Sequence, residues 1–450
     1  MAFILFLAVC IALLAGYPVA MTLAGVSLIC AAVGILTGHF EASLLLGFPN
    51  RVFDIVSSST LLAVPLFILM GVILERSRLA EELLANMALA CRRLPMGLGV
   101  SVVLVGTLLA ASTGIVGATV VTMGLMSLPI MLKQGYSPSL ASGLICATGT
   151  LGQIIPPSIA LILLSDVIAS AYQQANLNAG VFDASVVSAG DFFIAAIVPG
   201  LMLVVGYLLY LLFISRAHKK AHAQPMADIN SRDASSIFRL VQAIVPTLML
   251  IVAVLGSIML GFATPTEAAA LGAGCALVLS AIKKRLSLKF LKDSVEQSFR
   301  MNAMVFFILI GASLFSLTFR GFGGEELIEA GLSGLPGGAM TALFIVMLGV
   351  FVMGFILDFI EITFIVIPLV GPTLLAMGFD PIWLGIIFAL NLQTSFLTPP
   401  FGFSLFYLRG VAPNSLQTSE IYRGVLPFIA IQLLVLAIII SFPNLLVTTA

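Results

Sequence analysis

The sequence predicts an all-α polytopic membrane protein made of two inverted repeats, each with a re-entrant hairpin and a broken helix. Hydrophobic residues make up 60% of the 450 residues and charged residues only 9%, and the mean hydropathy is +1.19. A soluble domain needs far more polar surface to cover its core, so the lipid bilayer is the expected solvent. The prediction rests on two further observations, an internal repeat and two Pro-Pro pairs that interrupt helices.

The charge balance and the scattered cysteines exclude several classes of function. Twenty Lys and Arg residues balance twenty Asp and Glu residues, so no nucleic acid or other polyanionic partner is indicated. The five cysteines stand singly, which fits neither a disulfide framework nor a metal site. Residues 1–16 lack a basic region and a small-residue cleavage site, and we expect them to form a retained span.

Two sequence landmarks recur at a constant offset of 243 residues. The Gly-Tyr-Ser-Pro of residues 135–138 matches the Gly-Phe-Asp-Pro of residues 378–381, and Pro156-Pro157 matches Pro399-Pro400. Self-similarity of this kind indicates two copies of one unit. We therefore predict a first repeat over 1–215, a cytoplasmic linker over 216–239 and a second repeat over 240–450.

The distribution of charge predicts that the two copies are inverted. The segment after the third span of the first copy carries arginines, among them Arg76 and Arg78, whereas its counterpart carries Glu325 and Glu326. If the first segment lies inside and the second outside, all basic residues except Arg51 and Arg320 fall on the cytoplasmic side, as the positive-inside rule expects. Both termini are then predicted to be periplasmic.

Each copy is expected to contain three spans, a short amphipathic segment, a hairpin, an interrupted span and a closing span. In the first copy these are residues 2–15, 19–38, 52–75, 79–90, about 98–132, 138–165 and 192–215, with a long external loop over 166–191. In the second copy they are residues 240–262, 268–282, 302–319, 320–338, about 339–375, 381–408 and 424–442.

The two interrupted spans are broken at equivalent places. Proline removes a backbone donor and glycine permits unusual backbone angles, and such breaks are tolerated at membrane depth only inside protein or beside a watery cavity. Exposed carbonyls and hydroxyls suit a dehydrated Na⁺, and helix N-termini suit an anion. A packing kink is the alternative reading, but paired breaks across a repeat indicate a transport site. The candidate residues are Gly149, Thr150, Gly152, Pro156, Pro157, Gln393, Thr394, Ser395, Thr398 and Pro399.

The hairpin tips are expected to face these breaks. The first tip offers small and hydroxylated residues, namely Thr113, Gly114, Gly117 and Thr119, which either bind an ion or only allow close packing. The second tip contains Asp358 and Glu361 in an otherwise apolar hairpin. Ionisable groups at membrane depth mark an ion or proton pathway, although a hydrated tip or a carboxylate capping a half-helix is an open alternative.

Glu267 has a structural interpretation. Thr264-Pro265-Thr266-Glu267 has the spacing of an N-cap, a proline at the first helical position and a glutamate at the third. This pattern predicts a capping box, and we favour it over ion binding at Glu267.

Four motifs, taken together, resemble the large membrane subunit of tripartite ATP-independent periplasmic (TRAP) transporters. They are Leu-Ala-Val-Pro-Leu-Phe-Ile-Leu-Met-Gly at 62–71, Gly-Thr-Leu-Gly with Ile-Pro-Pro-Ser at 149–158, Ala-Thr-Pro-Thr-Glu-Ala-Ala at 263–269 and Leu-Thr-Pro-Pro-Phe-Gly at 397–402. The resemblance runs through essentially the whole chain. At the first tip, Ile115-Val116 stands where members of the family often have two serines.

The resemblance implies an elevator-type, Na⁺-coupled symporter of the ion-transporter superfamily in the bacterial inner membrane. It implies import of a carboxylate that a periplasmic substrate-binding protein delivers, with a separate small four-helix membrane subunit as partner. Na⁺ is the implied coupling ion, without any cofactor. One ion would lie between residues 113–119 and 149–157, and a second between Asp358–Thr363 and Gln393–Pro400.

Three rival functions remain at this point. An intramembrane enzyme using Asp358 or Glu361 would need a second convergent carboxylate or a metal cluster, and neither is visible, so no enzyme activity is expected. A channel would need no alternating access. An H⁺-coupled or binding-protein-independent organic anion carrier of the same fold is the nearest alternative. No Gly-rich loop ending in Gly-Lys-Ser/Thr is present for ATP.

Overall fold

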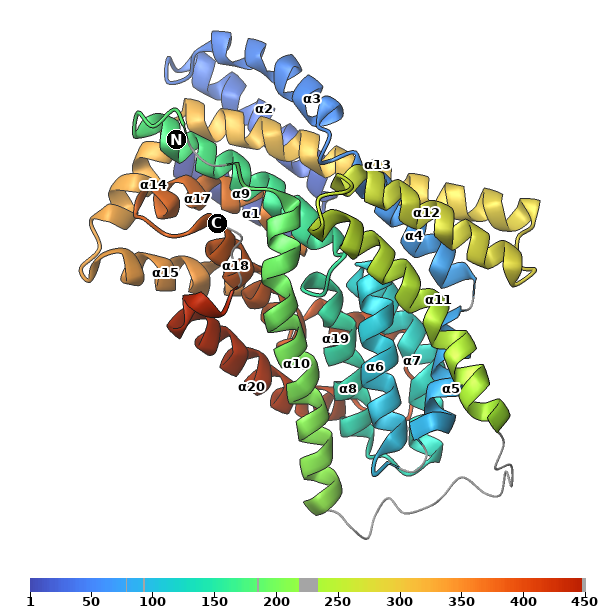
Figure 1. Cartoon of the computed structure of the whole chain (residues 1–450). Helices are drawn as coiled ribbons and strands as arrows, with labels where there is room; N and C mark the ends of the chain where they lie inside the picture. Colours follow the sequence, from blue (N-terminus) through green and yellow to red (C-terminus); the bar gives the residue numbers. More distant parts are fainter. Residues whose placement is uncertain (78, 92–93, 184–185, 218–233, 447–450) are drawn as a thin grey trace.

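The computed structural model describes the chain except residues 78, 92–93, 184–185, 218–233 and 447–450, and the side chains of 80, 112–113, 217 and 234–243. Its described part is built from helices joined by short connections (Figure 1). The first half contains α1 Ala2–Leu14, α2 Val19–Leu36, η1 Ala42–Gly47, α3 Phe48–Ser57, α4 Ala63–Arg76, α5 Leu79–Ala90, α6 Gly97–Thr113, α7 Val116–Lys133, α8 Pro138–Thr150, η3 Leu151–Gln153, α9 Ile159–Asn178 and α10 Ala189–Ala217. The second half contains α11 Ala234–Met259, α12 Pro265–Ile282, α13 Leu288–Gly321, α14 Gly324–Ser333, α15 Gly338–Met353, α16 Phe359–Ile365, α17 Ile367–Ala376, α18 Pro381–Leu397, α19 Phe403–Val411, α20 Thr418–Ser441 and η4 Pro443–Leu445.

Six helices in the described part are long and apolar enough to cross a bilayer: α2, α7, α10, α12, α13 and α20. The pair α16 and α17 passes the same test as one segment that is bent by 56°. The predicted fold class is confirmed: the protein is a multi-pass helical membrane protein with hairpins and broken helices in both halves.

The two hairpins enter the molecule from different sides (Figure 1). The first, α6 and α7, starts near the end where α10 finishes, at the bottom of the picture. The second, α15 with α16 and α17, starts beside α14, at the left, where α20 finishes. The repeat boundaries themselves stay a prediction.

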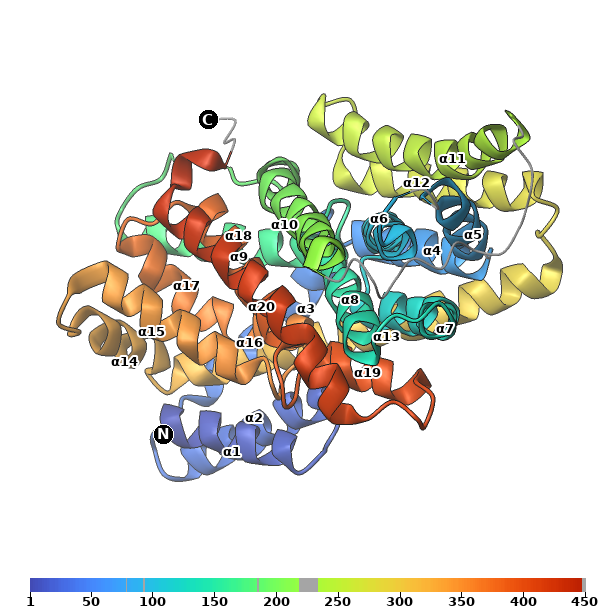
Figure 2. The same cartoon turned by 90° about the horizontal axis from the view of Figure 1, so that it is seen from below.

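Helices of the two halves pack against each other throughout the molecule. α4 packs on α12 and α2 packs on α13, and these four helices form one group with α11 and α5. α8 packs on α20, while α9 packs on α17 and α18. Figure 2 shows α1 and α2 on one side of the molecule, α11 and α12 on the other, and α8, α9, α18 and α20 between them.

Three sequence predictions about boundaries are wrong. Residues 52–75 are not one span, because the chain turns at 58–62, where Ser58 Oγ accepts a hydrogen bond of 3.2 Å from the Leu61 N–H. The predicted external loop 166–191 is helical as far as Asn178, since polar side chains are compatible with a helix outside the hydrocarbon. The predicted linker 216–239 is shorter, because α10 runs to Ala217 and α11 begins at Ala234. The middle of that linker lies outside the described residues.

Candidate substrate and ion site

A cavity of about 390 Å³ lies where the two hairpin tips and the two helix breaks meet. Residues 114–118 of the first tip and Asp358, Phe359 and Ile360 of the second tip form part of its wall. The breaks contribute Gln153 and Phe396. Its size is within the range of sites for small organic molecules.

The first tip is a tight connection between α6 and α7. Gly114 has φ +62°, and its N–H donates to the Ala110 carbonyl at 2.9 Å. A Cβ at Gly114 would lie 3.0 Å from the backbone nitrogen of Ile159, and one at Gly117 would lie 2.9 Å from the Tyr407 ring. Glycine is therefore required for the tip to reach α9 and α19.

The first break is stabilised by its own hydroxyl groups. Ser158, the residue before α9, donates a hydrogen bond of 2.7 Å to the Gly152 carbonyl and approaches the Gln153 carbonyl at 3.3 Å. Thr150 Oγ1 donates to the Ala147 carbonyl at 2.9 Å. These bonds satisfy carbonyl groups that the interrupted helix leaves without an intrahelical partner.

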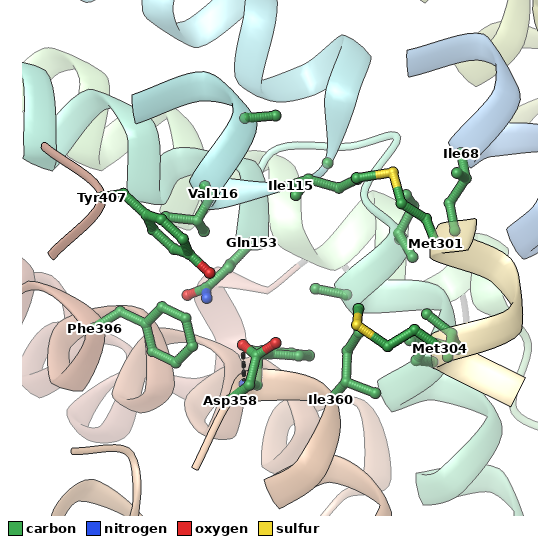
Figure 3. Close-up of a pocket in the computed structure, with 18 of the residues that line it drawn as sticks. Ile68, Ile115, Val116, Gln153, Met301, Met304, Asp358, Ile360, Phe396 and Tyr407 are labelled. Carbon is green, nitrogen blue, oxygen red and sulfur yellow. Dashed lines mark hydrogen bonds between the residues drawn. The ribbon is translucent and has the colours of Figure 1, made fainter. Parts of the chain in front are cut away.

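The second tip begins α16 with a capping box. Asp358 Oδ1 accepts a hydrogen bond of 2.6 Å from the Phe359 N–H, and Glu361 Oε2 accepts one of 2.9 Å from the Asp358 N–H. The alternative in which these carboxylates cap a half-helix is thus confirmed. Figure 3 shows the Asp358 carboxylate at the edge of the cavity, facing Gln153 and Tyr407, whose polar ends point toward each other.

The second break is tied to the first arm of its hairpin. Asn391 Nδ2 donates to the Met347 carbonyl at 2.8 Å, and Ser395 Oγ donates to the Phe351 carbonyl at 2.7 Å. Across the break, Ser404 Oγ donates to the Phe396 carbonyl at 2.8 Å. The Pro-Pro bond is cis in this break and in the first one.

Several buried polar atoms near the breaks make no hydrogen bond within the described part of the chain. They are Oε1 of Gln153, Oγ1 of Thr363 and both Oε1 and Nε2 of Gln393. Gln393 and Thr363 are both fully buried. Buried polar atoms are nearly always paired with protein, water or an ion, so these oxygens are available for an additional ligand.

The wall opposite the tips belongs to α4 and α13. It carries Ile68 and Glu75 of α4, together with Gln297, Met301 and Met304 of α13. Among the described residues, the charged side chains that line the cavity are Glu75 and Asp358, and none is basic. No group of three or more His, Cys, Asp or Glu suited to a metal occurs in the described chain. An anion therefore needs positive charge from elsewhere to occupy this cavity.

The sequence matches the family described as "Tripartite ATP-independent periplasmic transporter, DctM component" over residues 4–445. The chain belongs to this family. It is 30% identical to the C4-dicarboxylate TRAP transporter large permease protein DctM of Rhodobacter capsulatus, over 88% of this chain and 89% of that protein. It is 28% identical to the ectoine/5-hydroxyectoine TRAP transporter large permease protein UehC of Ruegeria pomeroyi, over 99% and 97%.

Two solved structures have a similar fold. The Alcanivorax borkumensis YdaH transporter superposes with a TM-score of 0.63 at 16% identity, covering 90% of both chains. Neisseria gonorrhoeae MtrF, whose title describes a class of antimetabolite efflux pumps, superposes with a TM-score of 0.56 at 12% identity, covering 89% of this chain and 83% of that one.

In this TRAP permease the structure brings only some of the predicted site residues to the cavity. Gly114, Gly117 and Asp358 line it. Thr119, Thr150, Thr394 and Thr398 donate their hydroxyls to carbonyls of their own helices. Glu361 is buried in the capping box, and the Thr113 side chain lies outside the described residues. The remaining candidates are not in the cavity wall: Thr363 lies in α16 of the second tip, and the others, Gly149, Gly152, Pro156, Pro157, Gln393, Ser395 and Pro399, form or flank the breaks.

The permease site also contains residues that the sequence did not indicate. Gln153 and Tyr407 supply polar groups, and Met301 and Met304 supply thioethers from α13. A signal was present for Gln153, because it stands between the glycines and the Pro-Pro pair of the first break. The α13 residues had no signal, since only tertiary packing brings them to the tips.

Glu267 lies at a helix start, as predicted. Its Oε2 accepts from the Thr264 N–H at 2.8 Å, and its own N–H donates to Thr264 Oγ1 at 3.3 Å. Thr266 Oγ1 donates to the Ser59 carbonyl at 2.6 Å. The start of α12 thereby holds the turn at 58–62 that separates α3 from α4.

Proposed function

We propose that this permease imports an organic acid by Na⁺-coupled symport with an elevator movement. The observation that carries the proposal is the convergence of both tips and both breaks on one cavity. Its lining charges are acidic, and unpaired buried oxygens lie in the adjoining breaks. A carboxylate would bind there only with cations beside it, and Na⁺ ligated by carbonyl, hydroxyl and amide oxygens supplies that charge.

Two of the named relatives support an anionic substrate. The R. capsulatus protein is named for C4-dicarboxylates, and a protein of Oleidesulfovibrio alaskensis, 28% identical over 58% of its own length, is named for isethionate. Both are small acids. A cavity of about 390 Å³ accommodates molecules of this size.

The proposed ion positions follow the two pairs of tips and breaks. One Na⁺ would use oxygens around residues 113–119 and 149–157, near the Gln153 Oε1 atom. The other would use oxygens around 358–363 and 393–400, where Thr363 and Gln393 have unpaired atoms. Each positive charge that moves inward across 100 mV contributes about 2.3 kcal/mol to substrate accumulation.

The mobile unit would contain α6–α9 and α15–α19, and the fixed unit α2–α5 and α11–α13. The cavity lies between these units, since its tips and breaks belong to the first and its Ile68 and Met301 wall to the second. Sliding of the first unit along the second would expose the cavity alternately to the two sides. Na⁺ would order the tips before this movement.

The family description as one component of a tripartite periplasmic system supports two further partners. We propose a small four-helix membrane subunit and a periplasmic substrate-binding protein. The permease would lie in the bacterial inner membrane, with both termini in the periplasm.

The test is uptake into proteoliposomes that contain the permease, its small subunit and its binding protein. Radiolabelled succinate and isethionate are supplied outside under an inward Na⁺ gradient, an inward H⁺ gradient or neither. We expect accumulation only with Na⁺ and only with the binding protein. Uptake driven by H⁺, or uptake that does not need the binding protein, would replace this proposal with the nearest alternative carrier.

A further inference from the structure

A second cavity, of about 500 Å³, lies against the C-terminal half of α13, from Leu309 to Arg320. One wall is formed by α3 and α13, which carry Arg51 and Arg320. The other wall is formed by α9 and α17. This external cavity therefore lies between the same two units as the central one, but near the predicted periplasmic end.

The two arginines that line the external cavity differ in whether a carboxylate pairs with them. Arg320 donates to Glu325 Oε1 from Nε at 2.8 Å and from Nη2 at 2.6 Å. Arg51 is half-buried and makes no hydrogen bond or ion pair with another described residue. Burial, and then the charge of Arg320, lower the pKa of Arg51, while Glu325 and Asp54 act in the opposite direction.

Two carboxylates also line this cavity. Asp54 is exposed on α3, and Asp166 lies on the α9 wall, half-buried. Neither approaches Arg51 within 4.0 Å among the described side chains. A half-buried guanidinium without a contacting anion is costly, and an entering carboxylate would relieve that cost by bidentate hydrogen bonds.

The two cavities differ in their basic side chains, and this difference indicates which ligand the arginines bind. No basic side chain lines the central cavity within the described chain, whereas two line the external one. Hydroxyls of Ser313 and Ser316 add hydrogen-bonding groups beside Arg320. An anion that approaches from outside meets guanidinium groups first and the acidic central site only afterwards.

One face of α13 connects the two cavities. Met301 and Val305 line the central cavity, and Leu309, Ala312, Ser316 and Arg320 line the external one. Their spacings of three and four residues place them on a common helix face. Met304 and Ser316 are about 18 Å apart along the axis at 1.5 Å per residue.

We propose that the external cavity is a receiving site for the carboxylate or sulfonate group of a small organic anion, bound by Arg51 and Arg320 before the anion enters the central site. This inference rests on the proposed function, because it takes the transported substrate to be the ligand. Na⁺ is not needed at the receiving site, since its positive charge comes from the protein.

Binding in Na⁺-free buffer isolates the receiving site from the central one. The complex of the permease with its small subunit is purified in choline chloride, and its thermal unfolding midpoint is measured against succinate, pyruvate and isethionate at constant ionic strength. The wild type should show a saturable stabilisation by at least one of these probes. Arg51→Gln should raise its apparent Kd by about tenfold, the value of one charge-assisted hydrogen bond.

Two further variants make the result specific. Asp166→Asn removes an opposing charge from the same cavity and should lower the apparent Kd, in the direction opposite to Arg51→Gln. Arg300→Gln removes an exposed arginine that pairs with Glu296 and lines neither cavity, so it should leave the Kd unchanged. If Arg51→Gln fails to fold, the apparent Kd values of Asp166→Asn and Arg51→Lys are compared with that of the wild type instead.

Two results would overturn the proposal. One is the absence of saturable stabilisation by all three probes, and the other is an equal Kd for the wild type, Arg51→Gln and Asp166→Asn. Because the titration measures no transport, it separates this inference from the proposed function. Na⁺-driven uptake without anion binding in choline buffer would leave the symporter standing and remove only the receiving site.

Discussion

Gly143 of α8 and Gly424 of α20 bring the backbones of the two helices into direct contact. A Cβ at Gly143 would lie 2.0 Å from the Gly424 carbonyl oxygen, and one at Gly424 would lie 1.9 Å from the Ser139 carbonyl oxygen. Because backbone atoms cannot move aside locally, we expect Gly424→Ala to lower the stability by about 3 kcal/mol, the upper part of the usual range for overpacking. Thermal unfolding in detergent measures this loss.

Gly410 provides the control for that substitution. It lies in α19, has an ordinary negative φ, and a Cβ there would meet nothing within 4 Å. Gly410→Ala should keep or slightly raise the unfolding temperature, since alanine favours a helix over glycine by about 1 kcal/mol. Equal unfolding temperatures for the two alanine variants would show that the helices are not in backbone contact.

Gln393 should be dispensable for folding but needed for Na⁺ dependence. Both of its side-chain polar atoms are buried without a partner in the described structure. We expect Gln393→Leu to unfold at the wild-type temperature or above it in Na⁺-free buffer, because leucine removes a buried unsatisfied amide. The Na⁺ concentration for half-maximal uptake should rise by about tenfold, as expected for one lost ligand to a charge. A variant with unaltered Na⁺ dependence would refute the ion position at the second break.

Gln432 should behave in the opposite way, because its amide nitrogen is paired, whereas its Oε1 has no partner among the described residues. Its Nε2 donates to the Tyr207 hydroxyl at 2.8 Å and lies 3.3 Å from Thr150 Oγ1, and all three residues are buried. Gln432→Leu leaves these hydroxyls without that donor, so we expect a loss of about 1–3 kcal/mol in the free energy of unfolding. Measured beside Gln393→Leu, it compares a buried glutamine whose Nε2 has partners with one whose Nε2 and Oε1 both lack them in the described structure.

A double-mutant cycle tests the Gln432 interpretation. Tyr207→Phe removes one of the two partners, so the double variant with Gln432→Leu should lose less stability than the sum of the single variants. Additive losses would mean that the amide and the hydroxyl do not interact.

Asp358 has a capping role that can be separated from its proposed part in the site. Asparagine is as good an N-cap as aspartate, whereas alanine costs about 0.5–2 kcal/mol. Asp358→Asn should therefore unfold near the wild-type temperature but take up substrate with weaker Na⁺ dependence, and Asp358→Ala should lose both properties. If Asp358→Asn takes up substrate with unchanged Na⁺ dependence, the Asp358 carboxylate only caps α16 and does not take part in the ion site.

The sequence could predict the features that depend on local chemistry. Pro156-Pro157 and Pro399-Pro400 interrupt helices in any surroundings, and the Thr264–Glu267 spacing fixes a helix start whatever packs against it. The offset of 243 residues between the two copies then predicted the position of the second break from that of the first. These signals were enough for the fold class and for the position of the tips and breaks.

The sequence could not predict features that arise from tertiary packing. The turn at 58–62 has no proline or glycine, and the Thr266 hydroxyl that donates to its Ser59 carbonyl comes from a helix about 200 residues further along the chain. Tyr407 and Met301 reach the cavity because α19 and α13 cross near the tips, which no local pattern encodes. The hydroxyls of Thr394 and Thr398 looked available but bond their own helices.

The pairing of α4 with α12, of α2 with α13 and of α8 with α20 has a consequence for biosynthesis. Each pair joins a helix of the first half to one of the second. While the first half is being made, the glycine face of α8 has only lipid or the insertion machinery to contact. The ribosome must complete α20 before the glycine face of α8 is covered. The first half therefore stays in the membrane without this packing partner until α20 has been inserted.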